Sequence, residues 1–166
     1  MGYYIIIRGP LGCGKTTTAK ALSARLSAEY LSVDEVINEY KLDSDKEDGF
    51  ISQASFKKAN DHLAEKAKEF LDKKIPVIID GNFYWKSQIE DLASKLVYPY
   101  AIFTLDAPLP VCVNRDSKRE NPLGADAVKV VYEKTASVEA GKKIDVTRET
   151  EAIITEIIDV LIMKNR

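Results

Sequence analysis

The chain has 166 residues, of which 45% are hydrophobic and 30% charged, with a formal net charge of −2. This balance is typical of a soluble globular domain with its own core, and it excludes both a disordered chain and a broad basic surface for non-specific nucleic-acid binding. His62 is the single histidine, which excludes a multi-histidine metal site.

Cysteine content and terminal residues bear on the compartment. Cys13 and Cys112 are too few for a disulfide framework and favour a reducing environment. The longest apolar run, residues 3–7, has the length of a strand and not of a membrane span. The first residues lack the basic, apolar and small-residue segments of a signal peptide. We therefore expect residues 1–166 to form a single cytoplasmic domain with no membrane partner.

Strand candidates recur along the chain. Three β-branched apolar runs, residues 3–7, 77–79 and 101–105, each end in a turn signal. Continuous apolar strands are buried on both faces, so we expect a parallel sheet covered by helices on both sides. Residues 30–33 and 143–146 are weaker strand candidates.

Helical patterns fill the intervals between these strands. Residues 15–27 follow the first strand, and residues 51–74 place a row of apolar residues on one face, namely Ala59, Leu63, Ala67 and Phe70. The last helix has a wide isoleucine-rich stripe, with acidic residues early and basic residues late, which matches the helix dipole. Alternating strands and helices imply right-handed βαβ units and a doubly wound α/β fold.

A complete phosphate-binding motif follows the first strand and opens the first helix. Residues 9–16, here called the cradle, read GPLGCGKT and match the pattern G-x-x-x-x-G-K-[ST]. Glycines let this backbone bend so that its N–H groups point at phosphate oxygens, and the helix N-terminus adds its positive end. The alternative is an ordinary glycine turn, but the strand before and the helix after favour phosphate binding.

The cradle residues have distinct expected tasks. Lys15 can reach the β- and γ-phosphates, and the Thr16 hydroxyl is placed to ligate Mg²⁺. Cys13 is interpreted as a small filler within the loop. The residues predicted to bind the nucleotide are Gly9, Gly12, Cys13, Gly14, Lys15, Thr16 and Thr17.

Two carboxylates are candidates for catalysis and metal binding. Asp34 follows the weak second strand, where it can accept the proton of an attacking hydroxyl, although a helix N-cap is the alternative. Asp80 ends the strand at residues 77–79 in the Walker B position, whose task is to hold Mg²⁺; its alternative is a turn residue. The two carboxylates could exchange roles, which the sequence alone does not decide.

A basic segment follows the third clear strand. Arg115, Lys118 and Arg119 share one face of a helix expected to end near residues 121–122, with a turn at residues 122–124 leading into a second helix. We predict that Arg115 and Arg119 belong to a mobile lid, about residues 108–140, and neutralise the transferred phosphoryl group. A solvated face with interleaved acidic residues is the alternative.

Two further segments have open interpretations. The aromatic residues Phe83, Tyr84 and Trp85 follow Asp80 and line either an acceptor pocket or the seam between helix and sheet. The acidic stretch at residues 43–48 is interpreted as a solvated loop, with an acceptor-facing surface as the less favoured alternative.

The chain resembles the small P-loop kinases of metabolite and polynucleotide type, a group with shikimate, gluconate and adenylylsulfate kinases, chloramphenicol phosphotransferase, zeta toxins and polynucleotide kinases. The resemblance rests on the cradle, on residues 32–34 and 77–82, and on residues 115–119 after the third strand. It implies a three-layer fold whose five-stranded parallel sheet has the order 2-3-1-4-5, a helical lid, and ATP with Mg²⁺. It also implies that Asp34 is the acceptor's base, that the two arginines clamp the phosphates, and that residues 145–148 lie near the adenine.

Departures from the family patterns narrow the range of acceptor classes. Adenylate-kinase-like enzymes have Asp-Gly-Phe-Pro-Arg after the third strand, whereas residues 80–84 read DGNFY, which argues against a nucleoside monophosphate. Polynucleotide kinases often have an arginine at the position of Ile37. We therefore expect a kinase that transfers the γ-phosphoryl group of ATP to a small-molecule hydroxyl. The alternatives are a kinase acting on RNA or a polynucleotide 5′-hydroxyl, which the net charge disfavours, and a nucleotide-binding switch.

Overall fold

The computed structural model describes all 166 residues as an α/β structure with a central sheet and a small separate hairpin. The sheet contains β1 (Tyr4–Arg8), β2 (Glu29–Ser32), β5 (Val77–Gly81), β6 (Tyr100–Asp106) and β7 (Lys142–Asp145), and the hairpin contains β3 (Lys46–Glu47) and β4 (Phe50–Ile51). The helices are α1 (Lys15–Leu26), α2 (Val33–Glu39), α3 (Gln53–Leu71), α4 (Lys86–Lys95), α5 (Leu109–Ser117), α6 (Ala125–Ala136) and α7 (Thr150–Lys164).

The sheet has the predicted topology. Its order is β2-β5-β1-β6-β7 and every neighbouring pair is parallel, so the sheet strands taken in chain order run 2-3-1-4-5. β1 is the central strand and pairs with β5 on one side and β6 on the other. All five carboxyl ends therefore meet at one edge, and the loops that follow them are brought together there.

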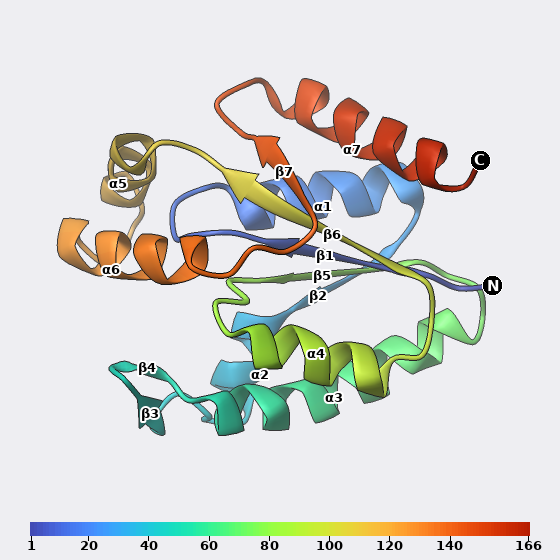
Figure 1. The fold of residues 1–166 in the computed structure, drawn as a ribbon, viewed down its shortest axis with the longest axis horizontal. Coiled ribbons are helices and arrows are strands. Elements are labelled where there is room, and N and C mark those ends of the chain that lie inside the picture. The colour runs from blue at the N-terminus through green and yellow to red at the C-terminus, as the bar shows by residue number, and fades with distance from the viewer.

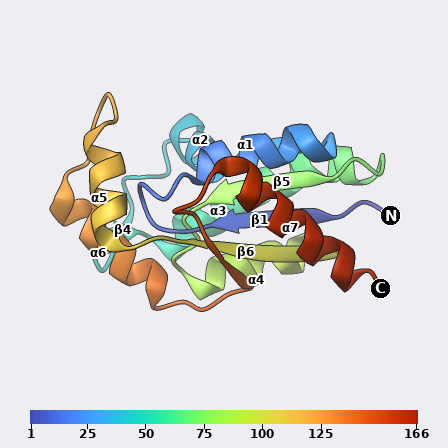
Figure 2. The same cartoon turned by 90° about the horizontal axis from the view of Figure 1, so that it is seen from above.

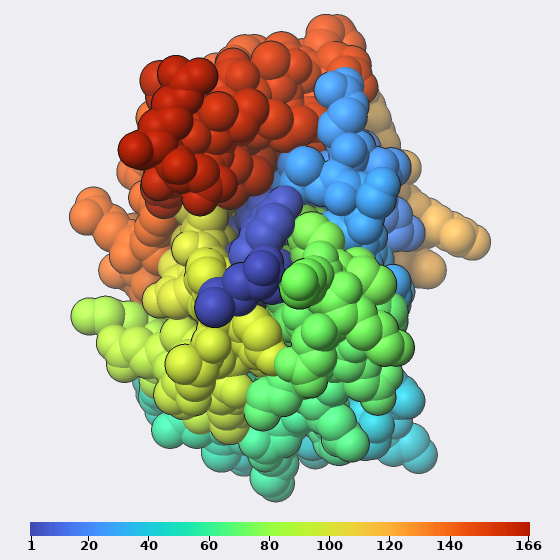
Figure 3. Space-filling model, turned by 90° about the vertical axis from the view of Figure 1, so that its right-hand side faces the viewer, coloured from blue at the N-terminus to red at the C-terminus, as the bar shows by residue number.

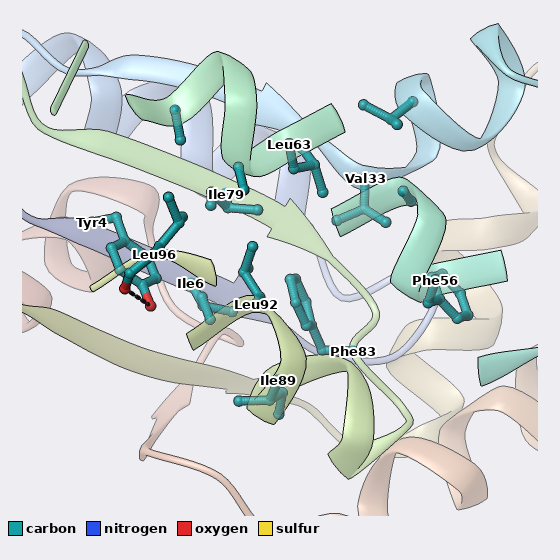
Figure 4. Packing of buried hydrophobic residues seen from close by; sticks show 14 of the residues in the cluster. Tyr4, Ile6, Val33, Phe56, Leu63, Ile79, Phe83, Ile89, Leu92 and Leu96 are labelled. Atoms are coloured by element: carbon teal, nitrogen blue, oxygen red, sulfur yellow. Dashed lines mark hydrogen bonds between the residues drawn. The ribbon is translucent and has the colours of Figure 1, made fainter. Parts of the chain in front are cut away.

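Helices cover both faces of the sheet. In Figure 1, α1 and α7 lie above the sheet, and α2, α3 and α4 lie below it. Alternate residues of β1 enter different cores: Ile5 and Ile7 pack with α1 and α7, whereas Tyr4 and Ile6 pack with α2, α3 and α4. Figure 4 shows the second of these cores. The continuous apolar strands are thus explained by burial on both faces, as predicted.

Helices α5 and α6 stand apart from the layers. They extend beyond the carboxyl ends of the strands, as Figures 1 and 2 show. The chain termini lie at the opposite end of the molecule, where Figure 3 shows the N-terminal residues between α7 and the segment before β5. No helix combines the length and the apolar character that crossing a membrane requires.

Three parts of the chain differ from the sequence-based expectations. The acidic stretch at residues 43–48, expected as a solvated loop, contributes β3 to the β3–β4 hairpin, and residue 51, expected to begin a helix, belongs to β4. Residues 86–95 form α4, for which no helix was predicted. Helix α5 ends at Ser117 and not near residue 121, because Asp116 directs its side chain toward the next turn.

Candidate active site

The cradle has a backbone conformation that needs glycine at two positions. Gly12 has φ 77° and Gly14, which precedes the first residue of α1, has φ 86°, both in the left-handed region. A Cβ atom at Gly12 would also collide with the carbonyl oxygen of Cys112. The loop therefore turns sharply while lying against the start of α5.

The bent cradle leaves backbone donors unpaired. The amides of Gly12, Cys13 and Gly14 donate to no backbone or side-chain acceptor of the protein, and they lie at the positive end of α1. Lys15 Nζ lies over the same loop and donates to the carbonyl oxygen of Pro10 at 2.9 Å. Free N–H groups, a helix N-terminus and an ammonium group together form a site for a polyphosphate.

Asp80 lies at the end of β5, facing the start of α1. It is 5% exposed, and its Oδ2 atom accepts hydrogen bonds from Thr16 Oγ1 at 3.0 Å and from the Tyr30 hydroxyl at 2.7 Å. Burial, and then the hydrogen bond to Asp80, raise the pKa of Tyr30, so this phenol stays protonated and donates. Tyr30 was not among the predicted site residues, because a tyrosine in a weak strand carries no motif.

The Thr16–Asp80 pair fits a magnesium ion. Mg²⁺ prefers oxygen ligands and keeps several waters, so it takes few protein ligands in nucleotide sites. One hydroxyl and one carboxylate 3.0 Å apart, beside a phosphate cradle, provide such ligands.

Asp34 lies in the first turn of α2, directly after β2. The N-cap of this helix is Ser32, whose hydroxyl accepts from the Glu35 amide at 3.2 Å, so the alternative interpretation of Asp34 as the cap is wrong. The pKa of Asp34 is raised, chiefly by desolvation and also by Asp80, while Lys15 and Arg119 oppose the shift. Its side chain is therefore free of a capping task and has an increased affinity for a proton.

The two predicted arginines occupy different positions. Arg115, on α5, donates to the Cys13 carbonyl at 3.2 Å and to the Val146 carbonyl at 2.8 Å, so it joins the cradle to the loop after β7. Arg119 follows the end of α5, and its guanidinium lies 3.9 Å from the carboxylate of Asp116. The sequence pattern had predicted that both arginines lie on one helix. In the structure only Arg115 lies on α5, and Arg119 lies beyond its end.

A single cleft brings most of the predicted site residues together. It has a volume of about 600 Å³, and its lining includes every candidate except Gly9, which is buried. The candidates that line it are Gly12, Cys13, Gly14, Lys15, Thr16, Thr17, Asp34, Asp80, Arg115 and Arg119. Val146 and Arg148 also line the cleft, in the segment that the family resemblance associates with adenine.

The aromatic residues after β5 belong to the packed core. Phe83 is fully buried, and Tyr84 and Trp85 are at most 9% exposed. The indole N–H of Trp85 donates to the Ile51 carbonyl at 2.8 Å, which attaches the hairpin to this segment. Lys134 of α6 places its Nζ 3.6 Å from the centre of the Trp85 ring. These contacts favour the seam interpretation over an open aromatic pocket.

Arg8, at the end of β1, is a second residue that the sequence analysis missed. It is fully buried immediately before the cradle. A lone arginine at the end of an apolar strand gives no signal of its own, because sequence patterns do not show which loops will surround it.

Comparisons with known proteins place the chain in a family. The AAA domain family matches residues 5–140, and the chain belongs to it. A comparison with curated proteins gave no match.

Solved structures resemble the chain over nearly its whole length. A sugar kinase from Janibacter sp. HTCC2649 is 20% identical with a TM-score of 0.78, covering 97% of this chain and 95% of that chain. The tunicamycin resistance protein of Deinococcus radiodurans is 23% identical with a TM-score of 0.71, covering 97% and 96%. Shikimate kinase from Aquifex aeolicus is 21% identical with a TM-score of 0.68, covering 95% of each chain. The chain therefore has the fold of the small P-loop kinases, as its sequence predicted.

Proposed function

We propose that this protein is an ATP-dependent kinase that transfers the γ-phosphoryl group to a hydroxyl of a small molecule. One observation carries the proposal: a single cleft holds the cradle, the Thr16–Asp80 pair, Asp34 and the two arginines. A nucleotide switch needs the cradle and a metal site, whereas phosphoryl transfer also needs a base and cations near the transferred group. The structural similarity to a sugar kinase and to a shikimate kinase supports this proposal.

The proposed reaction uses these residues in distinct roles. The acceptor oxygen attacks the γ-phosphorus in line, a new P–O bond forms, the bond to the β-phosphate oxygen breaks, and ADP leaves. Asp34 takes the hydroxyl proton, which its raised pKa favours. Lys15, Arg115 and Arg119 stabilise the negative charge on the phosphoryl oxygens. Thr16 and Asp80 would hold Mg²⁺, which supplies further charge neutralisation when bound.

Charge distribution bears on the class of acceptor. The chain contains no arginine between Arg25 and Arg115, a stretch that includes α2, the hairpin, α3 and the segment after β5. Arginine is the side chain that binds carboxylate and phosphate groups in a bidentate manner. From this stretch the lining of the cleft includes only Asp34 and Asp80, and two carboxylates disfavour an anionic acceptor. This charge distribution supports a small alcohol that is not itself strongly anionic and argues against RNA as the acceptor.

Transfer from radiolabelled ATP to pools of small metabolites, to RNA and to water tests the proposal. We expect label to enter a small alcohol. Label in RNA alone would overturn the acceptor class, and slow hydrolysis without any acceptor would favour a switch.

Asp34→Asn tests the proposed base. We expect turnover to fall by a factor of at least ~100, the usual scale for a lost general base, while the affinity for Mg·ATP stays close to that of the wild-type protein. Glu35→Gln is the matched control, because it changes the neighbouring carboxyl group on the same helix turn. Turnover of Asp34→Asn at the level of the control would remove Asp34 from the mechanism.

A further inference from the structure

Arg8 is a buried cation without a carboxylate partner. Its residue is 0% exposed, and none of the ion pairs in the structure includes it. Burial lowers the pKa of its guanidinium to about 10, which shows that the site disfavours the charge. An apolar side chain at this position would avoid the cost of desolvating a charge. The presence of an arginine therefore needs a reason, which its hydrogen bonds supply.

Oxygens from three parts of the chain surround the guanidinium. Nε and Nη2 donate to the Phe83 carbonyl at 3.3 and 3.1 Å. Nη1 donates to Thr104 Oγ1 and to the Val138 carbonyl, both at 2.9 Å, and Nη2 also donates to the Thr135 carbonyl at 3.1 Å. All five N–H groups of the arginine are thereby used. Two of the acceptors lie at the carboxyl end of α6, where the helix dipole is negative and favours a cation.

These acceptors belong to segments that carry the proposed site. Arg8 itself directly precedes the cradle, and Phe83 follows Asp80 in the loop after β5. Phe83 has φ 48°, a left-handed conformation that is unfavourable for a residue with a side chain and is held here by the surrounding contacts. Thr135 and Val138 end the α5–α6 pair that carries Arg115 and Arg119. One side chain therefore joins the cradle, the Asp80 loop and the base of the helix pair.

Residues 135–140 are attached by hydrogen bonds as well as by the packing of Val138 and Ala140 against the core. A cavity of about 260 Å³ lies beside this segment, lined in part by Arg8, Thr104 and Val138. Thr104 adds a second attachment, because its hydroxyl donates to the Ala140 carbonyl at 2.6 Å. At the other end of the helix pair, residues 118–124 are exposed. The pair is thus fixed at the end of α6 and least enclosed around Arg119.

We propose that Arg8 is a positioning residue that fixes the pivot of the α5–α6 pair against the cradle, so that the arginines of this pair meet the transferred phosphoryl group. The inference rests on the proposed kinase function. Arg8 contacts no substrate in this account and acts through Thr135, Val138 and Phe83. Its loss should therefore affect the closed, reactive arrangement more than the binding of nucleotide.

Arg8→Lys and Thr104→Val test this inference. The lysine keeps the charge but loses the planar fork, and the valine keeps the shape of Thr104 but loses its hydroxyl. For Arg8→Lys, we expect turnover of Mg·ATP, measured as ADP release, to fall at least about tenfold with KM near the wild-type value. In both variants, residues 135–140 should exchange their amide hydrogens faster than in the wild-type protein, a readout that needs no acceptor.

Asn60→Ala is the control for general loss of stability. Asn60 is fully buried between α3 and α4, where it donates to Gln88 and Asp91, away from the helix pair. We expect a lower melting temperature with unchanged turnover. If Arg8→Lys does not fold, the amide exchange of Thr104→Val tests the inference in its place.

The outcomes separate the inference from the proposed function. If the variants keep the wild-type kcat and the wild-type rate of amide exchange at residues 135–140, the role of Arg8 is overturned. The kinase proposal would remain intact in that case. A wild-type protein that transfers phosphate to no acceptor other than water would overturn the proposed function and this inference with it.

Discussion

Asp34 and Asp80 lie in one cleft but differ in their surroundings. Asp80 accepts hydrogen bonds from Thr16 and Tyr30, whereas Asp34 has no hydrogen-bond donor in the protein and a raised pKa. A carboxylate with fixed donors is suited to holding a metal ion, and one without them is suited to accepting a proton. These contacts favour Asp34 as base and Asp80 as metal ligand, a choice that the sequence left open.

The raised pKa of Asp34 predicts a gain of stability when its charge is removed. A carboxyl group that holds its proton more tightly in the folded state loses stability as pH rises from the unfolded value of 3.8 through the folded pKa. Asp34→Asn should therefore melt at a slightly higher temperature than the wild-type protein at pH 7, because the Asp34 residue is exposed and solvent screens much of the effect. The difference should shrink as pH falls toward 3.8, and calorimetric melting curves across this range measure it.

Glu35→Gln, which removes a charge from the same turn, serves as the reference for this effect. A melting temperature for Asp34→Asn at or below the wild-type value at pH 7 would show that Asp34 stabilises the fold and is not a strained functional group.

Residue positions were predictable where a motif places them. The cradle residues and Asp80 follow from their positions after apolar strands, because local sequence fixes both the strand end and the turn. Arg8, Tyr30 and Asp116 were missed as contributors, since each acts on oxygens or amides that are distant in the sequence or belong to loops. Such contacts depend on tertiary packing, which a single sequence does not display.

At the scale of elements, the connection between α5 and α6 is organised by one carboxylate. Asp116 is 1% exposed and accepts from the amides of Leu123 and Gly124 at 3.0 to 3.2 Å. The sequence suggested an exposed acidic residue interleaved with arginines. In the structure its side chain instead fixes the turn that starts α6 and ends α5 at Ser117.

Asp116→Ala should destabilise this connection. Loss of charge-assisted hydrogen bonds to the two amides predicts a decrease of about 1–3 kcal/mol in the free energy of unfolding. Urea titration measures the loss, and amide exchange in residues 118–124 should become faster. Glu120→Ala, an exposed neighbour, should change neither quantity, and an equal loss in both variants would refute the structural role of Asp116.

The central elements were predictable because their patterns are continuous and their ends carry turn signals. The five sheet strands and the helices at α1, α3 and α7 were found with small shifts of their ends. The hairpin was not, because strands of two residues leave no periodic pattern. Helix α4 was missed because its sequence follows directly on an aromatic segment that gave no helix start signal.

At the scale of the whole molecule, the sheet order decides where chemistry can occur. With β1 central and every strand parallel, the cradle, Asp34 and Asp80 necessarily come together at the carboxyl edge. This arrangement followed from the family resemblance and was confirmed by the fold. The acceptor was not predictable to the same depth, because it depends on side chains from several loops that no motif specifies.

Calorimetric titration of the folded protein with Mg·ATP tests the central claim most directly, because every proposed step requires that residues 9–16 bind a nucleoside triphosphate. We expect one binding site per chain, and loss of that binding in Lys15→Ala, since Lys15 and the unpaired amides of the cradle hold the phosphates. Failure of folded wild-type protein to bind ATP or any other nucleoside triphosphate would contradict the account.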